Sequence, residues 1–205
     1  MTNANVPALV PSAGHSTRMG RPKLVLPLAD GKTVIGRLVR ALREGGATPV
    51  IVIVPPSAQE GADILKEEAQ GAGATVVVCA GPTADMRATV EVGLRSLTDE
   101  YPGVLLVPGD SPGVTAPLVS AVLEAFRAEP GRIVVPVFQG RRGHPIALPM
   151  RVCRRVASLP YGKGINALVR DINEDVNLLE CTNMGSVEDL DTPEDYAWWL
   201  SRGQG

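Results

Sequence analysis

The sequence predicts an α/β fold: a single domain with a central sheet that is mostly parallel and partly mixed, flanked by helices. Short apolar, β-branched runs alternate along the chain with segments of helical periodicity, which is typical of strands connected through helices. The chain of 205 residues has the length of one domain, and 44% of it is hydrophobic, enough for a substantial core. No internal repeat or shift in composition divides it, so we expect residues 1–205 to form one domain.

The clearest predicted elements lie in the first half. Val50–Val54 is an unbroken β-branched run, as expected for a strand buried on both faces. Apolar residues are spaced by four in residues 33–44, and a glycine pair ends this predicted helix. Ser57 and Glu60 have the spacing of a capping box, which predicts a helix from there to residue 70. Further strands are expected at residues 6–10, 75–79 and 104–107, and a further helix at residues 85–97.

The second half continues the alternation and ends on a helix. Thr192 and Pro193 suit the cap and first turn of that helix, where the missing N–H of proline costs nothing. Strands are expected at residues 133–137, 145–148 and 176–181, helices at residues 117–127, 151–158 and 165–171, and a tight turn at residues 140–143. In parallel sheets, ligands bind outside the carboxyl ends of strands. We therefore expect a site among the loops after residues 10, 54, 79 and 107.

Composition and charge exclude several classes of function. Lys and Arg number 20 against 22 Asp and Glu, a net charge of −2, which does not suit binding to a nucleic-acid backbone. The longest apolar run, Val50–Val54, is far too short to cross a membrane, and residues 1–6 lack the features of a signal peptide. From the charge and the short apolar runs we expect no nucleic-acid or membrane partner. The three cysteines, Cys79, Cys153 and Cys181, form no metal-binding pair and imply no disulfide framework, so we expect a reduced, cytoplasmic protein.

A glycine-bearing loop follows the first predicted strand at residues 11–23, and is called the basic loop below. It holds three cations within six residues, Arg18, Arg21 and Lys23, beside small residues that let backbone N–H groups approach an anion. It lacks the glycine pattern of dinucleotide folds, which disfavours an oxidoreductase, and it lacks the Walker pattern. A solvated turn with incidental charges is one interpretation, and a phosphate-binding loop is the other. The position after the first strand favours phosphate binding.

Two acidic positions could meet this loop. Asp110 directly follows the strand expected at residues 104–107, whereas Asp189 and Asp191 precede the last helix. A turn in which an Asp caps its own backbone is a structural explanation for Asp110. Acids in the first turn of the last helix complement its dipole, but Asp189 and Asp191 precede that helix and are explained less well. A cation site is the alternative. Mg²⁺ takes few protein carboxylates and fills its remaining positions with phosphate oxygens and water.

The basic loop also carries a longer motif. Its pattern Ser-Ala-Gly-x-Ser-x-Arg-Met-Gly-x-Pro-Lys, residues 12–23, resembles the signature of nucleotidyltransferases of the molybdenum-cofactor type, and more narrowly that of the molybdenum cofactor cytidylyltransferases. The similarity extends from residue 8 to residue 200. The resemblance implies the Rossmann-like fold of the nucleotide-diphospho-sugar transferases. It also implies that the N-terminal half binds the nucleotide and the C-terminal half the acceptor.

The resemblance implies roles for individual residues of the loop. Arg18 and Lys23 would carry the catalytic role by neutralising charge on the triphosphate of the nucleotide. Ser12, Ala13 and Gly14 would lie near the base. Their Ser-Ala-Gly sequence is closer to the Ala-Ala-Gly of cytidine-using relatives than to the Ala-Gly-Gly of guanosine-using ones, so CTP is favoured.

The same resemblance implies a metal site. A Gly-Asp-x-Pro motif at residues 109–112 implies that Asp110 binds Mg²⁺, or Mn²⁺ in its place. The motif Asp-x-Asp-Thr-Pro-Glu-Asp at residues 189–195 implies that Asp191 completes the site, with Asp189 as the alternative. Ser111 departs from the Gln or Met that is usual in the family, which leaves the contacts with the acceptor open.

Further residues are assigned by looser motifs. Gly81 and Thr89 would contact the nucleotide, although an ordinary helix start explains Thr89 equally well. An Arg-Gly-His-Pro turn and a Tyr-Gly-Lys-Gly turn would lie on the acceptor side. The residues expected to bind the acceptor are Arg142, Gly143, His144 and Lys163.

The implied reaction is attack by an acceptor phosphate on the α-phosphate of CTP, with release of pyrophosphate. The partners are a nucleoside triphosphate and a small phosphorylated acceptor. The molybdenum-bound pterin cofactor is the favoured acceptor, which would bring transient contact with a molybdoenzyme or its chaperone. Alternatives are a sugar phosphate, polyol phosphate or phosphonate as acceptor, with CTP or GTP, and a non-catalytic nucleotide-binding module. The four charged residues of the motifs disfavour the non-catalytic module.

Overall fold

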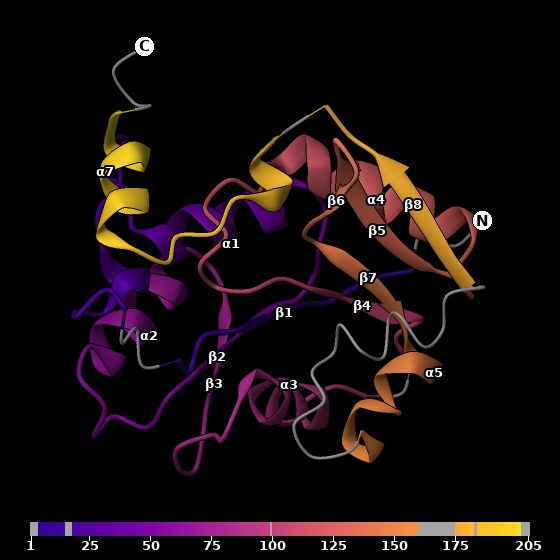
Figure 1. The fold of residues 1–205 in the computed structure, drawn as a ribbon. Coiled ribbons are helices and arrows are strands. Elements are labelled where there is room, and N and C mark those ends of the chain that lie inside the picture. The colour runs from indigo at the N-terminus through magenta and orange to yellow at the C-terminus, as the bar shows by residue number, and fades with distance from the viewer. Residues whose placement is uncertain (1–3, 15–17, 99, 160–174, 183, 202–205) are drawn as a thin grey trace.

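A mixed sheet lies at the centre of the structure, between layers of helices (Figure 1). The structure is a computed structural model that describes residues 4–14, 18–98, 100–159, 175–182 and 184–201. The strands are β1 (Ala8–Pro11), β2 (Val50–Val54), β3 (Thr75–Val78), β4 (Gly103–Leu106), β5 (Ile133–Phe138), β6 (Arg141–Arg142), β7 (Ile146–Pro149) and β8 (Val176–Glu180). They follow the order β3-β2-β1-β4-β7-β5-β6, with β8 paired to β5.

Most strands of the sheet run in the same direction. β1 pairs in parallel with both β2 and β4, and β2 pairs in parallel with β3. β7 is antiparallel to its two neighbours β4 and β5, so β5 has the direction of β4 again, and β8 is parallel to β5. Among the strands that the structure describes, only β7 and β6 are reversed. The sheet is therefore mostly parallel and partly mixed, which confirms the predicted fold class.

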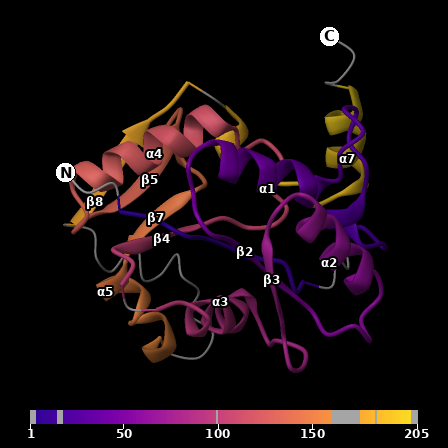
Figure 2. The same ribbon diagram turned by 180° about the vertical axis from the view of Figure 1, so that it is seen from behind.

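Helices cover both faces of the sheet, as Figures 1 and 2 show. On one face lie α1 (Val34–Glu44), α2 (Ala62–Gly71) and α4 (Ala116–Ala128), and on the other lie α3 (Met86–Arg95) and α5 (Met150–Cys153). The last helix, α7 (Pro193–Ser201), lies at the end of the molecule that carries α1 and α2 (Figure 1). Within the described ranges, no helix has the length and apolar character needed to span a membrane.

The core consists of two layers that the strands separate. In β2, Val50, Val52 and Val54 pack with the α1 face, whereas Ile51 and Ile53 pack with the α3 face. All five side chains of β2 are buried. Because successive residues of a strand point to opposite faces, this arrangement explains why the run is apolar throughout.

One predicted helix start is wrong. The capping box expected from Ser57 and Glu60 does not form, because α2 begins at Ala62 and no side chain caps it. Its N-cap is Gly61, whose φ of 76° is in the left-handed region that glycine adopts without strain. A Cβ at this glycine would also lie 2.7 Å from Pro22, so the turn before α2 packs directly on the basic loop.

The second half also differs from prediction: the two-residue strand β6 lies within the turn expected at residues 140–143, and one predicted helix is divided. The helix expected at residues 151–158 is split into α5 and a 3-10 helix, η2 (Val156–Ser158). The helix expected at residues 165–171 lies outside the described residues. The last helix is confirmed, and Thr192 caps it by accepting a hydrogen bond from the N–H of Asp195 at 3.2 Å.

Replacement of Phe126 by Ala is expected to lower the free energy of unfolding by about 3–5 kcal/mol. The ring is fully buried between α4 and the sheet, and a Cβ at Gly103 of β4 would lie 2.6 Å from its tip. Urea denaturation measures the change, and Ile64→Ala is the control because Ile64 is 54% exposed. Equal losses for the two variants would show that this core layer is not tightly packed.

Candidate active site

The carboxyl ends of β1 and β4 bring two predicted motifs together. The basic loop leaves β1, Asp110 follows β4, and these strands are parallel neighbours. The chain leaves β1 toward α1 on one face and reaches β4 from α3 on the other, so the motifs meet at a topological switch point. Gly109 permits the close approach of the loops, because a Cβ there would lie 2.6 Å from Ser12 Oγ.

Four charged side chains from three parts of the chain converge at this edge. Lys23 Nζ lies 2.6 Å from Asp110 Oδ2 and 2.8 Å from Asp191 Oδ1. Arg18 Nη1 lies 2.9 Å from Asp191 Oδ2. The side chain of Lys23 is only 13% exposed, so its charge needs these partners. The sequence predicted all four residues, and the structure places them in one network.

The ammonium group of Lys23 is held in its charged form. Burial alone would lower its pKa, but the charges and hydrogen bonds of Asp110 and Asp191 outweigh burial and raise the pKa above its usual value. Lys23 therefore carries a positive charge throughout the physiological pH range. It acts as the counter-ion of both carboxylates.

Asp189 and Asp191 are two positions apart but face different partners. Asp189 Oδ1 accepts a hydrogen bond from Ser111 Oγ at 3.0 Å, whereas Asp191 pairs with Arg18 and Lys23, two of the three cations of the basic loop. Loss of hydration around its carboxylate, followed by the charge of Asp110, raises the pKa of Asp189, although the residue as a whole is exposed. This arrangement favours Asp191 over Asp189 as the second carboxylate of a cation site with Asp110.

The ion pairs line a cavity of about 170 Å³. Ser12 and Gly14 also line it, together with Met86 of α3, which the sequence did not indicate. Ser12 donates to the carbonyl of Val10 at 3.2 Å, and both Ser12 and Ala13 are buried. Beside Gly14 there is open space, since a Cβ there would meet no atom within 4 Å. The small residues of the motif thus leave one wall of the cavity open to a ligand.

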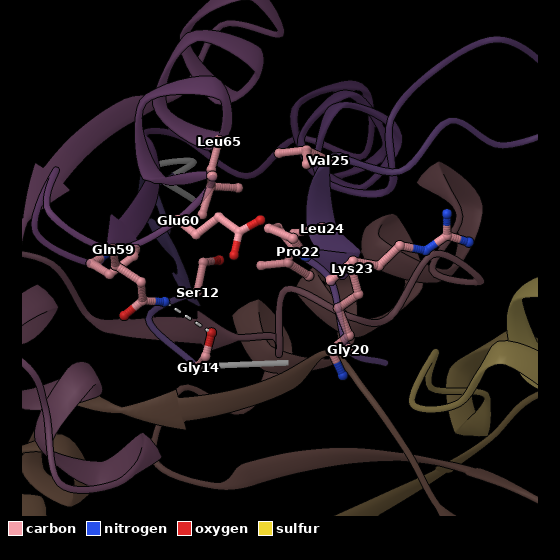
Figure 3. Close-up of a pocket in the computed structure, with 13 residues that line it drawn as sticks. Ser12, Gly14, Gly20, Pro22, Lys23, Leu24, Val25, Gln59, Glu60 and Leu65 are labelled. Atoms are coloured by element: carbon pink, nitrogen blue, oxygen red, sulfur yellow. Dashed lines mark hydrogen bonds between the residues drawn. The ribbon is translucent and has the colours of Figure 1, made fainter. Parts of the chain in front are cut away.

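A second cavity, of about 390 Å³, adjoins the basic loop (Figure 3). Both cavities are lined by Ser12, Gly14, Lys23 and Leu24. Gln59 Nε2 donates to the carbonyl of Gly14 at 3.3 Å, and Figure 3 shows the Glu60 carboxylate directed into the cavity. The sequence placed Gln59 and Glu60 in a helix and missed them. The sequence indicated these two residues only indirectly, through the expectation that the loop after residue 54 faces the site.

Gly81 and Thr89 line neither of these two cavities. Thr89 is buried, and its hydroxyl lies 2.7 Å from Thr83 Oγ1 and donates to the carbonyl of Asp85 at 3.2 Å. The hydroxyl therefore holds the start of α3. Beside Gly81 the space is open, as at Gly14.

Three of the four predicted acceptor residues, Arg142, Gly143 and His144, lie in the segment that connects β5 to β7. Arg142 is exposed on β6, and the buried Gly143 donates its N–H to the carbonyl of Pro136 at 2.8 Å. Lys163 lies outside the described residues. Arg141, which the sequence did not single out, lines a cavity of about 560 Å³ that also reaches Asp191.

His144 is uncharged at neutral pH. Burial lowers its pKa, and the negative charges of Asp189 and Asp110 offset this only in part. Its Nδ1 is buried, with no hydrogen-bond partner among the residues that the structure describes. The ring also bonds to the backbone of Leu106 and lines none of the three cavities described above, and it adds no positive charge to the site.

The donor set suits a hard divalent cation that arrives with phosphate. Asp110 and Asp191 both reach one cationic group, so they are close enough to share a cation. In the described part of the chain, no group of three or more His, Cys, Asp or Glu could hold a metal ion. Two carboxylates without a third protein ligand fit Mg²⁺ or Mn²⁺, which complete their coordination with phosphate oxygens and water.

The sequence profile of one protein family covers most of this architecture. The profile of the MobA-like NTP transferase domain matches residues 8–176. The chain belongs to the family of MobA-like NTP transferase domains. It is accordingly a nucleotidyltransferase, as the motifs predicted.

Individual relatives are similar to this MobA-like domain over most of its length. A 2-C-methyl-D-erythritol 4-phosphate cytidylyltransferase of Streptomyces coelicolor is 29% identical over 202 residues, which span 86% of this chain and 74% of the relative. The crystal structure of Rv0371c from Mycobacterium tuberculosis is 26% identical, with a TM-score of 0.80 over 96% of this chain and 98% of that one. The same mycobacterial protein has been solved in complex with manganese, with a TM-score of 0.77, the same identity and the same coverage.

The MobA-like match includes the basic loop and Asp110 but ends before the second acidic motif. The position of Asp191 in the site therefore rests on geometry: its carboxylate meets Arg18 and Lys23. The N–H of Leu190 donates to the carbonyl of Asp110 at 2.8 Å, which ties the second acidic motif to the first.

Proposed function

We propose that this MobA-like domain transfers CMP from CTP to the phosphate of a small acceptor and releases pyrophosphate. The observation that carries the proposal is the convergence of Arg18, Lys23, Asp110 and Asp191 on one cavity at the carboxyl edge of the sheet. Two cations for phosphate and two carboxylates for a metal are the groups that such a reaction needs. The N-terminal half would bind the nucleotide, and the C-terminal half the acceptor.

The side chains align and neutralise the reacting groups. Arg18 and Lys23 bind the triphosphate and stabilise the charge that develops on it. Asp110 and Asp191 hold Mg²⁺, which supplies further neutralisation of the phosphates when bound. An oxygen of the acceptor phosphate forms a bond to the α-phosphorus, and the bond from that phosphorus to the oxygen bridging to the β-phosphorus breaks. The acceptor phosphate is already ionised, so no strong base is needed.

Two observations support CTP as the nucleotide. Ser12, Ala13 and Gly14 resemble the sequence of cytidine-using relatives, and the 29% identical relative from Streptomyces is a cytidylyltransferase. Gly14 lies beside open space at the boundary of the two cavities, where a base could pack against the backbone.

Two classes of acceptor have support. The Arg142, Gly143 and His144 turn favours the molybdenum-bound pterin cofactor, which would bring the enzyme into contact with a molybdoenzyme or its chaperone. The relative from Streptomyces acts on 2-C-methyl-D-erythritol 4-phosphate, which favours a polyol phosphate or sugar phosphate. Either acceptor carries a phosphate monoester, for which the exposed Arg142 offers a positive charge.

Pyrophosphate release from each nucleotide and acceptor pair tests the proposal. The purified protein receives CTP or GTP, Mg²⁺, and either the molybdenum-bound pterin cofactor or 2-C-methyl-D-erythritol 4-phosphate. We expect release with CTP and one acceptor, and a CMP-linked product by mass spectrometry. Faster release with GTP would contradict the base assignment. No release from any pair, extended to further sugar phosphates and phosphonates, would contradict the proposed reaction.

A further inference from the structure

The carboxylate of Asp195 reaches further than a helix cap requires. Its Oδ2 accepts from the N–H of Thr192 at 2.8 Å, and the N–H of Asp195 donates to Thr192 Oγ1 at 3.2 Å. These two bonds make the reciprocal capping box of α7. The same Oδ2 also accepts from the N–H of Asp191 at 3.0 Å, one residue outside the box. This third bond lies outside the reciprocal pair, and it holds the backbone of a proposed metal ligand.

We propose that Asp195 is a positioning residue that fixes Asp191 for binding of the divalent cation, an inference that rests on the proposed function. Asp191 lies in a connecting segment between η4 (Met184–Val187) and α7, with no helix or strand to set its backbone. On its N-terminal side, the fully buried Leu190 is tied to the carbonyl of Asp110 at 2.8 Å. On its C-terminal side, the bond to Asp195 fixes the backbone. Asp191 is thereby held between two fixed points.

The rest of α7 is anchored without Asp195. Tyr196 Oη donates to the carbonyl of Pro27 at 2.7 Å, and Arg21 lies over its ring at 5.2 Å from the centroid. Trp199 is buried, and Arg37 lies 5.7 Å from the centroid of its ring. Loss of the Asp195 carboxylate should therefore release the segment around Asp191 while α7 stays docked.

Manganese binding, measured by electron paramagnetic resonance, tests this role apart from turnover. The protein is titrated with Mn²⁺ in the presence of CTP and without acceptor, so that no transfer occurs. We expect Asp195→Ala to bind Mn²⁺ about tenfold more weakly than the wild type, the lower end of the losses seen when an outer partner of a ligand is removed. Asp195→Asn should stay within about threefold, because an amide oxygen can accept the same two bonds.

Two controls distinguish a loss of the positioning of Asp191 from a general loss of protein stability. Thr33→Ala removes the cap of α1, where Thr33 Oγ1 accepts from the N–H of Gly36 at 3.1 Å. It should lower the melting temperature as Asp195→Ala does and leave Mn²⁺ affinity unchanged. In an Asp191→Asn background, Asp195→Ala should cause no further loss of Mn²⁺ affinity.

The outcomes distinguish failure of this inference from failure of the proposed function. Equal Mn²⁺ affinity in the wild type and Asp195→Ala, or a loss that persists in the Asp191→Asn background, would overturn the positioning role alone. A wild type that binds no Mn²⁺ with CTP or with GTP would overturn both the metal site and the inference built on it.

Discussion

Asp110→Asn is expected to lower the rate of nucleotidyl transfer by about 10²–10³-fold, the loss typical when one preorganised electrostatic group is removed from an active site. Asparagine keeps the shape of the side chain but removes the charge that pairs with Lys23 and that would hold the cation. The backbone carbonyl that accepts from Leu190 is untouched, so the fold should be retained. Steady-state pyrophosphate release measures the rate, and circular dichroism checks the fold.

Two further variants make the Asp110 result specific. Asp175→Asn removes the charge of an aspartate that pairs with Arg151, away from the residues of the site, and should leave turnover within about twofold, as surface pairs contribute little. Asp189→Asn should reduce turnover less than Asp191→Asn, because Asp189 bonds to Ser111 and not to the cations. Unchanged turnover in Asp110→Asn would refute the metal role. A larger loss from Asp189→Asn than from Asp191→Asn would reverse the choice between those two acids.

Lys23→Met is expected to have opposite effects on turnover and on binding of free metal. Turnover should fall by about a hundredfold or more, because a cation that neutralises the phosphates is lost. Free Mn²⁺ should bind more tightly than to the wild type, because the ammonium group that pairs with Asp110 and Asp191 no longer competes for them. Calorimetric titration with Mn²⁺ in the absence of nucleotide measures this second effect.

If Lys23→Met disrupted the site in general, both its turnover and its binding of free Mn²⁺ would be weaker than in the wild type. The matched control is Lys32→Met, since Lys32 is exposed and pairs only with Asp30 among the contacts described for it. We expect it to change neither turnover nor Mn²⁺ binding. Weaker binding of free Mn²⁺ by Lys23→Met would contradict the account in which Lys23 occupies the place of the metal.

Local patterns were sufficient to predict the fold class and most elements. The alternation of the two core layers along β2 follows directly from its apolar run, and Thr192 with Pro193 marked the start of α7 correctly. The failure at α2 has a local physical cause. Ser57 and Glu60 have the right spacing for a cap, but the left-handed Gly61 between them and the helix moves its start to Ala62.

The charged centre of the site was also predictable, because Arg18, Lys23 and Asp110 belong to motifs at the carboxyl ends of strands and Asp191 to a motif just before the last helix. What the sequence could not decide depends on tertiary contacts. The choice between Asp189 and Asp191 depends on which carboxylate meets Lys23 and which meets Ser111, across long separations in the chain. Glu60 came to the site only because the turn before α2 packs on the basic loop.

A crystal structure of the protein with CTP and Mn²⁺, with the metal located by its anomalous signal, tests the central claim most directly. The account predicts one strong peak between the carboxylates of Asp110 and Asp191, with the triphosphate in contact with Arg18 and Lys23. Lys23 Nζ should contact the triphosphate, and the metal should lie between the two carboxylates with which Lys23 pairs in the present structure. A metal bound away from Asp191, or a triphosphate bound away from the basic loop, would contradict the account.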